Sequence, residues 1–217
     1  MSKVNLKEKL LRILILFIGL VIAHLGVTLF LLANLGADPF NVLIQGLYRV
    51  TSFIPILTHG RVHMVICFLI ILVLLIVDKS YIGIGTLVCM FCGGPIIDFF
   101  NMLLGPLFAG NPSLVIRILV NILGCVILAF GMTIVIKSEA GTGPNDLVAI
   151  VISDKLKKKF SIIRMIVDFT FALSGFLLGG TLGIGTLICA FVVGPVAGLF
   201  MPFNEKWIKT LVTKLAP

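Results

Sequence analysis

The sequence predicts an all-α protein that crosses a membrane several times and consists of two internal repeats. Of its 217 residues, 59% are hydrophobic and 12% are charged, about half the charged fraction of a soluble domain. Six apolar runs approach or exceed the ~18 residues that a spanning helix needs: Leu11–Leu32, Val62–Val77, Leu87–Leu107, Leu114–Ile136, Ile162–Leu178 and Leu187–Met201. These runs and the scarcity of charge indicate a polytopic membrane bundle.

A repeated motif relates the two halves of the chain. Four positions recur 105 residues later (131 − 26 = 105): Gly26/Gly131, Thr28/Thr133, Gly36/Gly141 and Pro39/Pro144. Gly83–Thr86 recurs as Gly183–Thr186, 100 residues later (183 − 83 = 100). Matches at a nearly constant offset over most of a chain indicate an internal duplication. We therefore divide the chain into a first membrane repeat, 1–110, and a second, 111–217, which together form one integrated domain.

The first repeat gives the order of elements, and the second repeats it. The first long run, Leu11–Leu32, ends in a break at Gly36–Pro39. Phe40–Val50 then forms an apolar stretch that is too short to cross a bilayer comfortably. A loop and two further long runs complete the repeat. In the second repeat the short stretch is Asn145–Asp154.

Two topologies follow from these short stretches. If both cross, each repeat has four passes and the halves are parallel. If both are re-entrant or interfacial, each repeat has three passes and the halves are inverted. The equivalent flanks of the two repeats differ in charge. Lys3, Lys7, Lys9 and Arg12 in the first repeat correspond to Arg117 alone in the second, and the neutral Phe53–Gly60 corresponds to Lys155 and Lys157–Lys159. Because cytoplasmic loops carry the excess of Lys and Arg, we expect inverted three-plus-three spans, with parallel four-plus-four spans as the alternative.

The basic residues also predict the orientation. The formal net charge is +8, and the cationic residues lie in flanks and loops of apolar runs. That distribution is typical of cytoplasmic anchoring and argues against nucleic-acid binding. The first apolar run is too long for a signal-peptide core, and no cleavage site follows it. We expect a multi-pass protein with both termini in the cytoplasm.

The two Gly-x-x-Pro breaks are the candidate substrate site. Interrupted segments at matching places in two repeats are the best sequence indication of a transporter's site. A helix N-terminus exposes N–H groups and a positive dipole end, which suit an anion or carboxylate. The candidate substrate-binding residues are Gly36, Asp38, Pro39, Asn41, Gly141, Gly143, Pro144, Asn145, Asp146, Arg61 and Arg164. The competing interpretation is a plain turn between helices, with interfacial anchoring for the two arginines.

Three ionisable residues inside predicted spans are candidates for coupling to protons. They are His24, Asp98 and Asp168, and the other repeat has no ionisable residue at any of the three equivalent positions. Such residues are costly in a bilayer and usually functional. Asp168 follows Arg164 by four residues, so an intrahelical ion pair is the simpler explanation there. A hydrogen-bonded packing role is the simpler explanation for His24.

Other motifs give no support for chemistry. All five cysteines lie in apolar runs, where buried thiols pack as small hydrophobes. His59 and His63 have the spacing of metal ligands, but no third ligand is evident. The sequence contains no catalytic triad, zinc-protease or nucleotide motif. We expect no enzyme activity, no metal site and no cofactor.

Three sequence features together resemble the YczE/YitT-like family of small bacterial integral membrane proteins. They are Gly26…Gly36-x-x-Pro39-x-x-x-Leu43, the Gly83-x-Gly85-Thr86 entry and Gly94-Pro95-x-x-Asp98, and the similarity covers roughly Leu11–Met201. The resemblance implies a permease-like protein of the bacterial inner (cytoplasmic) membrane. The resemblance identifies no catalytic residues in this chain.

The duplication and its paired breaks predict a small secondary transporter or exporter of a small polar organic solute, anionic or zwitterionic. Two alternatives stay open: a channel-like facilitator, and an accessory membrane protein that transports nothing. The expected partners are the lipid bilayer and a small-molecule solute. Because six spans make a small bundle, a homodimer is plausible.

Overall fold

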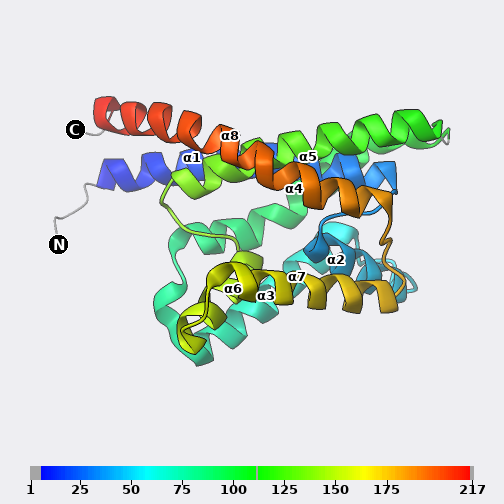
Figure 1. Cartoon of the computed structure of the whole chain (residues 1–217), viewed down its shortest axis with the longest axis horizontal. Helices are drawn as coiled ribbons and strands as arrows, with labels where there is room; N and C mark the ends of the chain where they lie inside the picture. Colours follow the sequence, from blue (N-terminus) through cyan, green and yellow to red (C-terminus); the bar gives the residue numbers. More distant parts are fainter. Residues whose placement is uncertain (1–5, 111, 216–217) are drawn as a thin grey trace.

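Helices account for the regular structure of the chain. The computed structural model describes residues 6–110 and 112–215. Within these ranges the chain forms eight α-helices and one 3₁₀ turn, which confirms the expected all-α class (Figure 1). They are α1 (Leu6–Ala33), α2 (Pro39–Val50), α3 (His59–Asp78), η1 (Lys79–Tyr81), α4 (Ile84–Phe108), α5 (Leu114–Lys137), α6 (Pro144–Leu156), α7 (Phe160–Leu177) and α8 (Ile184–Leu215).

Five of the described helices are long and apolar enough to cross a membrane: α1, α3 with η1, α4, α5 and α8. They match five of the six apolar runs. The sixth run forms α7, which has 18 residues and carries Arg164 and Asp168. The short helices α2 and α6 have 12 and 13 residues. At about 1.5 Å per residue, a straight helix of either length is shorter than a hydrocarbon core of about 30 Å.

Both short helices begin at the prolines of the breaks. Pro39 and Pro144 each occupy the first turn, where a missing N–H leaves no hydrogen bond unmade. Asp38 is the N-cap of α2, and its carboxylate accepts a hydrogen bond from the Asn41 N–H at 3.3 Å. Asp146 lies in the first turn of α6. Local sequence therefore fixes where each short helix starts.

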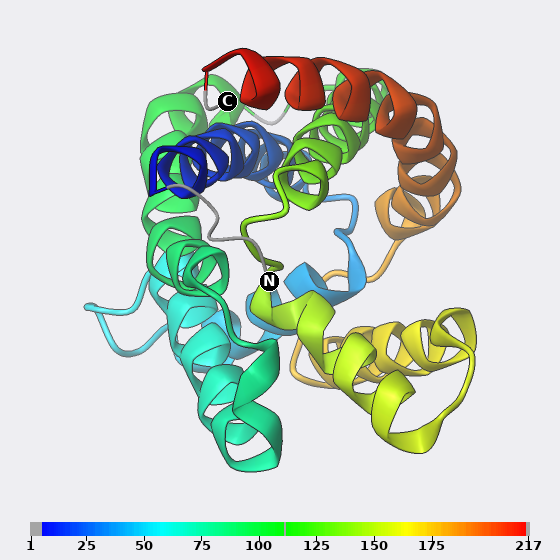
Figure 2. The same ribbon diagram turned by 90° about the vertical axis from the view of Figure 1, so that its left-hand side faces the viewer.

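The helices form an open ring. Neighbours pack in the order α8, α5, α1, α4, α3, then α2 and α6, then α7. Figure 2 shows this ring end-on, with α7 and α8 as its two free ends. The long helices α1, α5 and α8 lie side by side along one side, and α2, α6 and α7 form the other (Figure 1). The ring encloses the space into which both breaks project.

Two arginines at corresponding positions of the predicted repeats make reciprocal contacts. Arg12 donates to the Ser138 carbonyl at 3.1 Å, just past the end of α5. Arg117, which is 105 residues later (117 − 12 = 105), donates to the Ala33 carbonyl at 2.7 Å, at the end of α1. Each cation thus binds the negative end of the other repeat's first helix, where it is favourable. The two helices therefore pack antiparallel.

The breaks dock reciprocally as well. The Gly185 N–H donates to the Leu35 carbonyl at 2.7 Å, and the Gly85 N–H donates to the Ala140 carbonyl at 3.1 Å. Gly36 and Gly141 have φ values of +117° and +153°, a backbone region that favours glycine. Each break is therefore held against the start of the last long helix of the opposite repeat.

Candidate functional site

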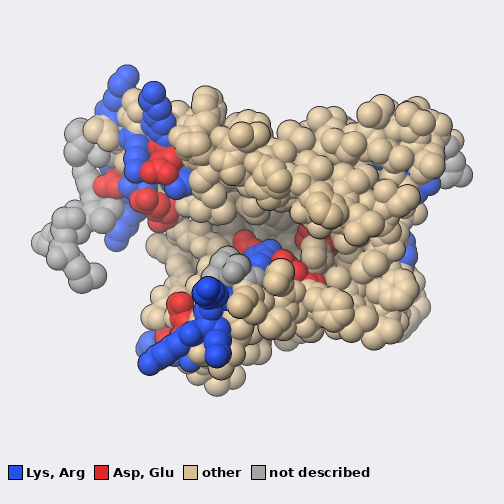
Figure 3. Space-filling model, viewed as in Figure 1, with Lys and Arg blue, Asp and Glu red and all other residues tan. Residues whose placement is uncertain are grey.

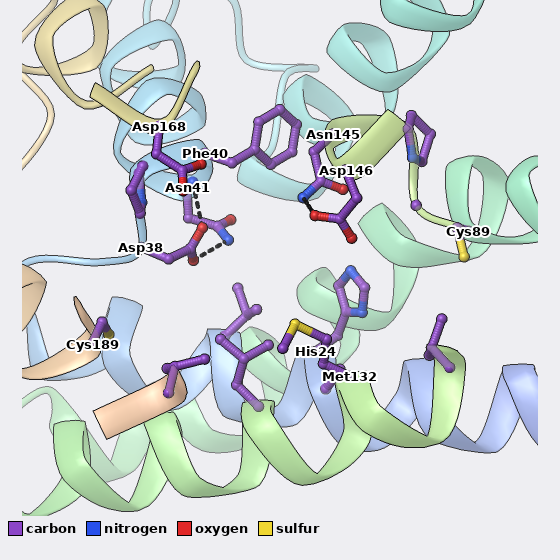
Figure 4. A pocket seen from close by; sticks show the side chains of 18 of the residues that line it. His24, Asp38, Phe40, Asn41, Cys89, Met132, Asn145, Asp146, Asp168 and Cys189 are labelled. Atoms are coloured by element: carbon purple, nitrogen blue, oxygen red, sulfur yellow. Dashed lines mark hydrogen bonds between the residues drawn. The ribbon is translucent and has the colours of Figure 1, made fainter. Parts of the chain in front are cut away.

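A cavity of about 600 Å³ lies inside the ring, between the N-terminal ends of α2 and α6. Residues of α1, α3, α4, α5, α7 and α8 complete its wall. Figure 4 shows Asp38, Asn41 and Asp168 on one side of the space and Asn145 and Asp146 on the other. Two segments that are about a hundred positions apart in sequence therefore form one site.

Most of the sequence-predicted candidates line this cavity. Eight of the substrate-binding candidates do so: Asp38, Pro39, Asn41, Gly143, Pro144, Asn145, Asp146 and Arg164. Of the coupling candidates, His24 and Asp168 also line it. Gly36 and Gly141 lie behind it, where they pack on the opposite repeat: a Cβ at Gly141 would come within 2.7 Å of the Thr86 nitrogen. The two glycines shape the breaks and do not touch the cavity.

Arg61 does not line the cavity, so the structure gives no support to its expected role in substrate binding. Its side chain is exposed and donates to the carbonyl of Ile56 in the loop before α3. Arg164, the equivalent residue, faces inward because α7 packs beside α6 and α2. Equivalent positions in the repeat therefore have different surroundings.

Asp98 also lies outside the cavity, where its carboxylate caps a helix. It accepts a hydrogen bond from the Gly60 N–H at 2.9 Å and another from the Thr58 hydroxyl. Both donors belong to the start of α3, where N–H groups lack helical partners. Asp98 therefore stabilises the contact between α3 and α4, and its place in the fold does not support a role in coupling.

The charged part of the cavity is centred on Arg164. Its guanidinium forms ion pairs with Asp146 Oδ1 at 2.6 Å and with Asp168 Oδ2 at 2.9 Å. The intrahelical pair with Asp168 is the one that the spacing predicted, and the pair with Asp146 joins α6 to α7. Asp38 is a third carboxylate, bound by the Asn41 Nδ2 at 2.7 Å. Arg164 is the one cationic side chain among the described residues that line the cavity, so ionised carboxylates leave an excess of negative charge.

Two polar side chains of the cavity have an unused hydrogen-bond acceptor. Asn41 is 5% exposed, and its Oδ1 has no hydrogen-bond partner among the residues that the structure describes. Its Nδ2 already donates to Asp38, which fixes the orientation of the amide. In His24 the Nδ1 lies 2.9 Å from the Leu20 carbonyl, which can only accept. The neutral ring therefore has its proton on Nδ1 and its Nε2 free to accept.

Sequence reasoning missed several other residues of the wall. Phe40, Met132 and Cys189 line the cavity (Figure 4). His63 lines it too, with its ring edge-on to His24 at a centroid distance of 5.6 Å. Phe40 follows Pro39 directly, so the break could have indicated it. The others come from separate helices, and no local pattern sets them apart from packing residues.

The chain has relatives among bacterial membrane proteins. A family model described as "Family of unknown function (DUF6198)" matches residues 10–202. The chain is 28% identical over 209 residues to the "Uncharacterized membrane protein YczE" of Bacillus subtilis (strain 168), covering 96% of this chain and 94% of the relative. It is 29% identical over 187 residues to an "Uncharacterized protein" of Haemophilus influenzae, covering 86% and 82%. No solved structure matches it.

Proposed function

The chain belongs to the family of unknown function DUF6198 and is related to YczE, as its motifs indicated, and from its cavity we propose that it is a small secondary transporter or exporter of an organic solute. One observation carries this proposal: a cavity of about 600 Å³, lined by two helix starts and four charged side chains, lies within a bundle of apolar spans. Ionisable groups in such spans mark solute or ion pathways. Paired interrupted helices form the substrate site of many secondary transporters.

Inverted halves are part of this proposal. The reciprocal contacts of Arg12 and Arg117 support inversion, because each binds the end of the other repeat's first helix. The path of α2 supports it too. It starts in the interior at Pro39 and returns to the end of the bundle where α1 ends, so that Arg49 contacts the Asn34 side chain at 3.4 Å. The helix α6 runs from the interior to the opposite end (Figure 1). Two re-entrant helices entering from opposite sides correspond to three spans per repeat.

The proposed membrane is the bacterial cytoplasmic membrane, with both ends of the chain on the cytoplasmic side. In Figure 3 most of the visible Lys and Arg side chains gather at one end of the molecule. The start of α1 and the end of α8 lie at that end (Figure 1). An excess of Lys and Arg marks the cytoplasmic side of membrane proteins.

The charge of the cavity supports a cationic or zwitterionic solute over an anion. The positive ends of both short helices are already compensated by the protein's own carboxylates, Asp38 at α2 and Asp146 in the first turn of α6. Arg164 is engaged by two carboxylates. The buried Asn41 Oδ1 is an unused hydrogen-bond acceptor. A ligand with N–H donors and a positive charge complements these groups. Of the two solute classes that the sequence predicted, anionic and zwitterionic, we therefore propose the zwitterionic one.

A thermal-shift screen of the purified protein tests this charge assignment. We expect saturable stabilisation by alkylamines, polyamines or amino acids, and none by matched carboxylates or sulfonates. Asp38→Asn should weaken binding of the stabilising amine roughly tenfold to hundredfold, because a charge-assisted hydrogen bond contributes about 1.5–3 kcal/mol. Asn caps helices as well as Asp does, so the unliganded protein should keep its melting temperature.

The matched control is Asp98→Asn, because Asp98 lies outside the cavity and caps α3. It should leave amine binding within about twofold of the wild-type value, a shift of about 0.4 kcal/mol. Selective stabilisation by carboxylates, or equal losses in the two variants, would contradict the assignment.

Flux measurements in proteoliposomes then separate the transporter from its rivals. A proton-coupled transporter should accumulate the stabilising amine when a pH gradient is imposed, with saturation, and Asp168→Asn should abolish that accumulation. A facilitator would only equilibrate the amine. Failure of every compound to bind or move, together with a stable stoichiometric complex with another membrane protein, would instead identify an accessory protein.

A further inference from the structure

The two flanks of the ring differ, although they come from equivalent elements. On one flank α3 and α4 touch through Gly60 and Gly94, where a Cβ on either glycine would overlap the other's carbonyl oxygen. On the other flank the equivalent residue is Gly194, which is 100 residues after Gly94 (194 − 94 = 100). At Gly194 and at Gly198, no described atom lies within 4 Å of the position that a Cβ would take. The contact that closes the first flank is therefore missing between α7 and α8.

The cavity reaches this open flank. Its wall includes Met165 of α7 and Ala190, Val193 and Gly194 of α8. Met165 is 66% exposed, and Phe191 next to Ala190 is 77% exposed. Figure 3 shows a hollow near mid-length of the molecule, with charged side chains inside it and uncharged surface above it and to its right. The opening is thus in the side of the bundle that faces hydrocarbon, away from both ends of the spans.

A charged interior with an apolar rim suits a ligand with two chemically different parts. Inside, the Asp38 carboxylate and the unpartnered Asn41 Oδ1 can accept hydrogen bonds, and Arg164 forms its ion pairs with Asp146 and Asp168. At the rim, Met165 and Gly194 offer apolar surface and open space. An ammonium group fits the first environment and an alkyl chain fits the second.

We propose that the ligand of this cavity is an amphipathic amine that enters from the bilayer between α7 and α8. Its ammonium group binds among Asp38, Asn41 and Asp168, and its alkyl chain leaves past Met165 and Gly194 into the lipid. A primary amine can pass the apolar rim in its neutral form, which is far less costly to desolvate than an ammonium ion. This inference rests on the proposed function and narrows its substrate to a membrane-soluble class.

Photolabelling of the full chain in phosphatidylcholine nanodiscs tests the proposal. The probe is dodecylamine with a diazirine in its chain, and its matched control is dodecanoic acid with the same diazirine. We expect the amine to label α7 and α8 around Met165 and Ala190, at least tenfold more than the acid does. Unlabelled dodecylamine should compete at least tenfold better than propylamine.

Two glycine variants test the route. Gly194→Phe should lower labelling by the amine at least tenfold, because the ring would fill the opening. Gly198→Phe is the matched control: it adds the same side chain one turn further along α8, into equally open space, but outside the cavity wall. It should leave labelling within twofold of the wild-type value.

Several outcomes would overturn the inference. Equal labelling by the acid and the amine would mean that the protein does not recognise the ammonium group. Equal competition by propylamine would mean that no apolar tail is needed, which leaves the proposed transport of a polar amine intact. Unchanged labelling of Gly194→Phe would exclude entry between α7 and α8.

Stronger competition by phosphatidylethanolamine than by dodecylamine would support the inference and identify a membrane lipid as the source. Specific labelling without flux in proteoliposomes would contradict transport and leave the ligand class standing.

Discussion

At the scale of single residues, Arg61 and Arg164 show how one sequence position can have two roles. The repeat makes them equivalent, yet Arg164 joins two carboxylates inside the cavity while Arg61 lies exposed beside the loop before α3. Their neighbours decide this difference. Asp146 reaches Arg164 from α6, whereas Arg61 meets only a carbonyl of its own loop among its described partners. Equivalent arginines therefore have unequal energetic importance.

Removing each arginine should show this difference in stability. Arg164→Gln leaves Asp146 and Asp168 without their cation in a partly buried site. We expect it to lower the free energy of unfolding by about 3 kcal/mol, the lower end for a broken buried pair. Arg61→Gln should cost less than about 1 kcal/mol, as is usual for exposed charges.

Denaturant unfolding of both variants in detergent would measure these costs. Equal costs for the two variants would mean that the ion pairs of Arg164 add no stability. In that case their role would be confined to the ligand.

At the scale of elements, the two breaks determine where the cavity lies. Pro39 and Pro144 start α2 and α6 in the interior, and Gly36 and Gly141 let the backbone turn back from the preceding long helices. The same glycines allow close contact with the opposite repeat, since a Cβ at Gly36 would come within 2.8 Å of the Thr186 nitrogen. Backbone conformation and packing thus both require glycine there.

Alanine substitutions can separate these two requirements. Gly36→Ala should lower the free energy of unfolding through backbone strain of about 1–3 kcal/mol and overpacking of about 1–3 kcal/mol. Gly179→Ala is the matched control, because Gly179 also has a positive φ, +89°, but no described atom lies within 4 Å of its Cβ position. It should show the strain alone.

Thermal and denaturant unfolding in detergent would give both values. Similar losses in the two variants would show that the contact between the first break and α8 contributes little. A larger loss at Gly36 would support its role as the docking point between repeats.

At the scale of the whole molecule, the ring is closed between α3 and α4 and open between α7 and α8. Tight contacts between small residues are how helices approach closely in a membrane, and the Gly60–Gly94 contact is of this kind. Gly194, at the matching position of α8, makes no such contact with a described residue. The open flank is what connects the charged interior to the side of the bundle.

The inverted topology stays a prediction, and it can be tested on intact cells. Single cysteines at Ser52 and Lys158 would be introduced into a variant that lacks the five native cysteines. Both positions are exposed in loops that follow the short helices. With inverted halves, a membrane-impermeant maleimide should label position 52 from outside and position 158 only after permeabilisation.

Protection of both positions in intact cells would support parallel halves instead. A control reaction on permeabilised cells shows that both cysteines are reactive. The result is independent of the ligand, so it tests the fold of the proposed transporter separately from its substrate.

The sequence by itself determined the features that depend on local chemistry. Apolar length predicted the long helices, and Gly-x-x-Pro predicted the starts of α2 and α6 within a residue or two. The same motifs indicated four polar side chains of the cavity, Asp38, Asn41, Asn145 and Asp146, because the breaks themselves form its two ends. The intrahelical pair of Arg164 with Asp168 followed from their spacing.

Only the tertiary structure decided what depends on contacts between distant helices. Asp98 caps α3 from α4, and Met132 and His63 meet in the cavity from separate spans. The opening between α7 and α8 also has no local signal, since Gly94 and Gly194 lie in nearly identical motifs. The physical reason is that a side chain's environment in a membrane bundle is set by which neighbour packs against it. Residues at matching positions of the two predicted repeats can therefore have different surroundings.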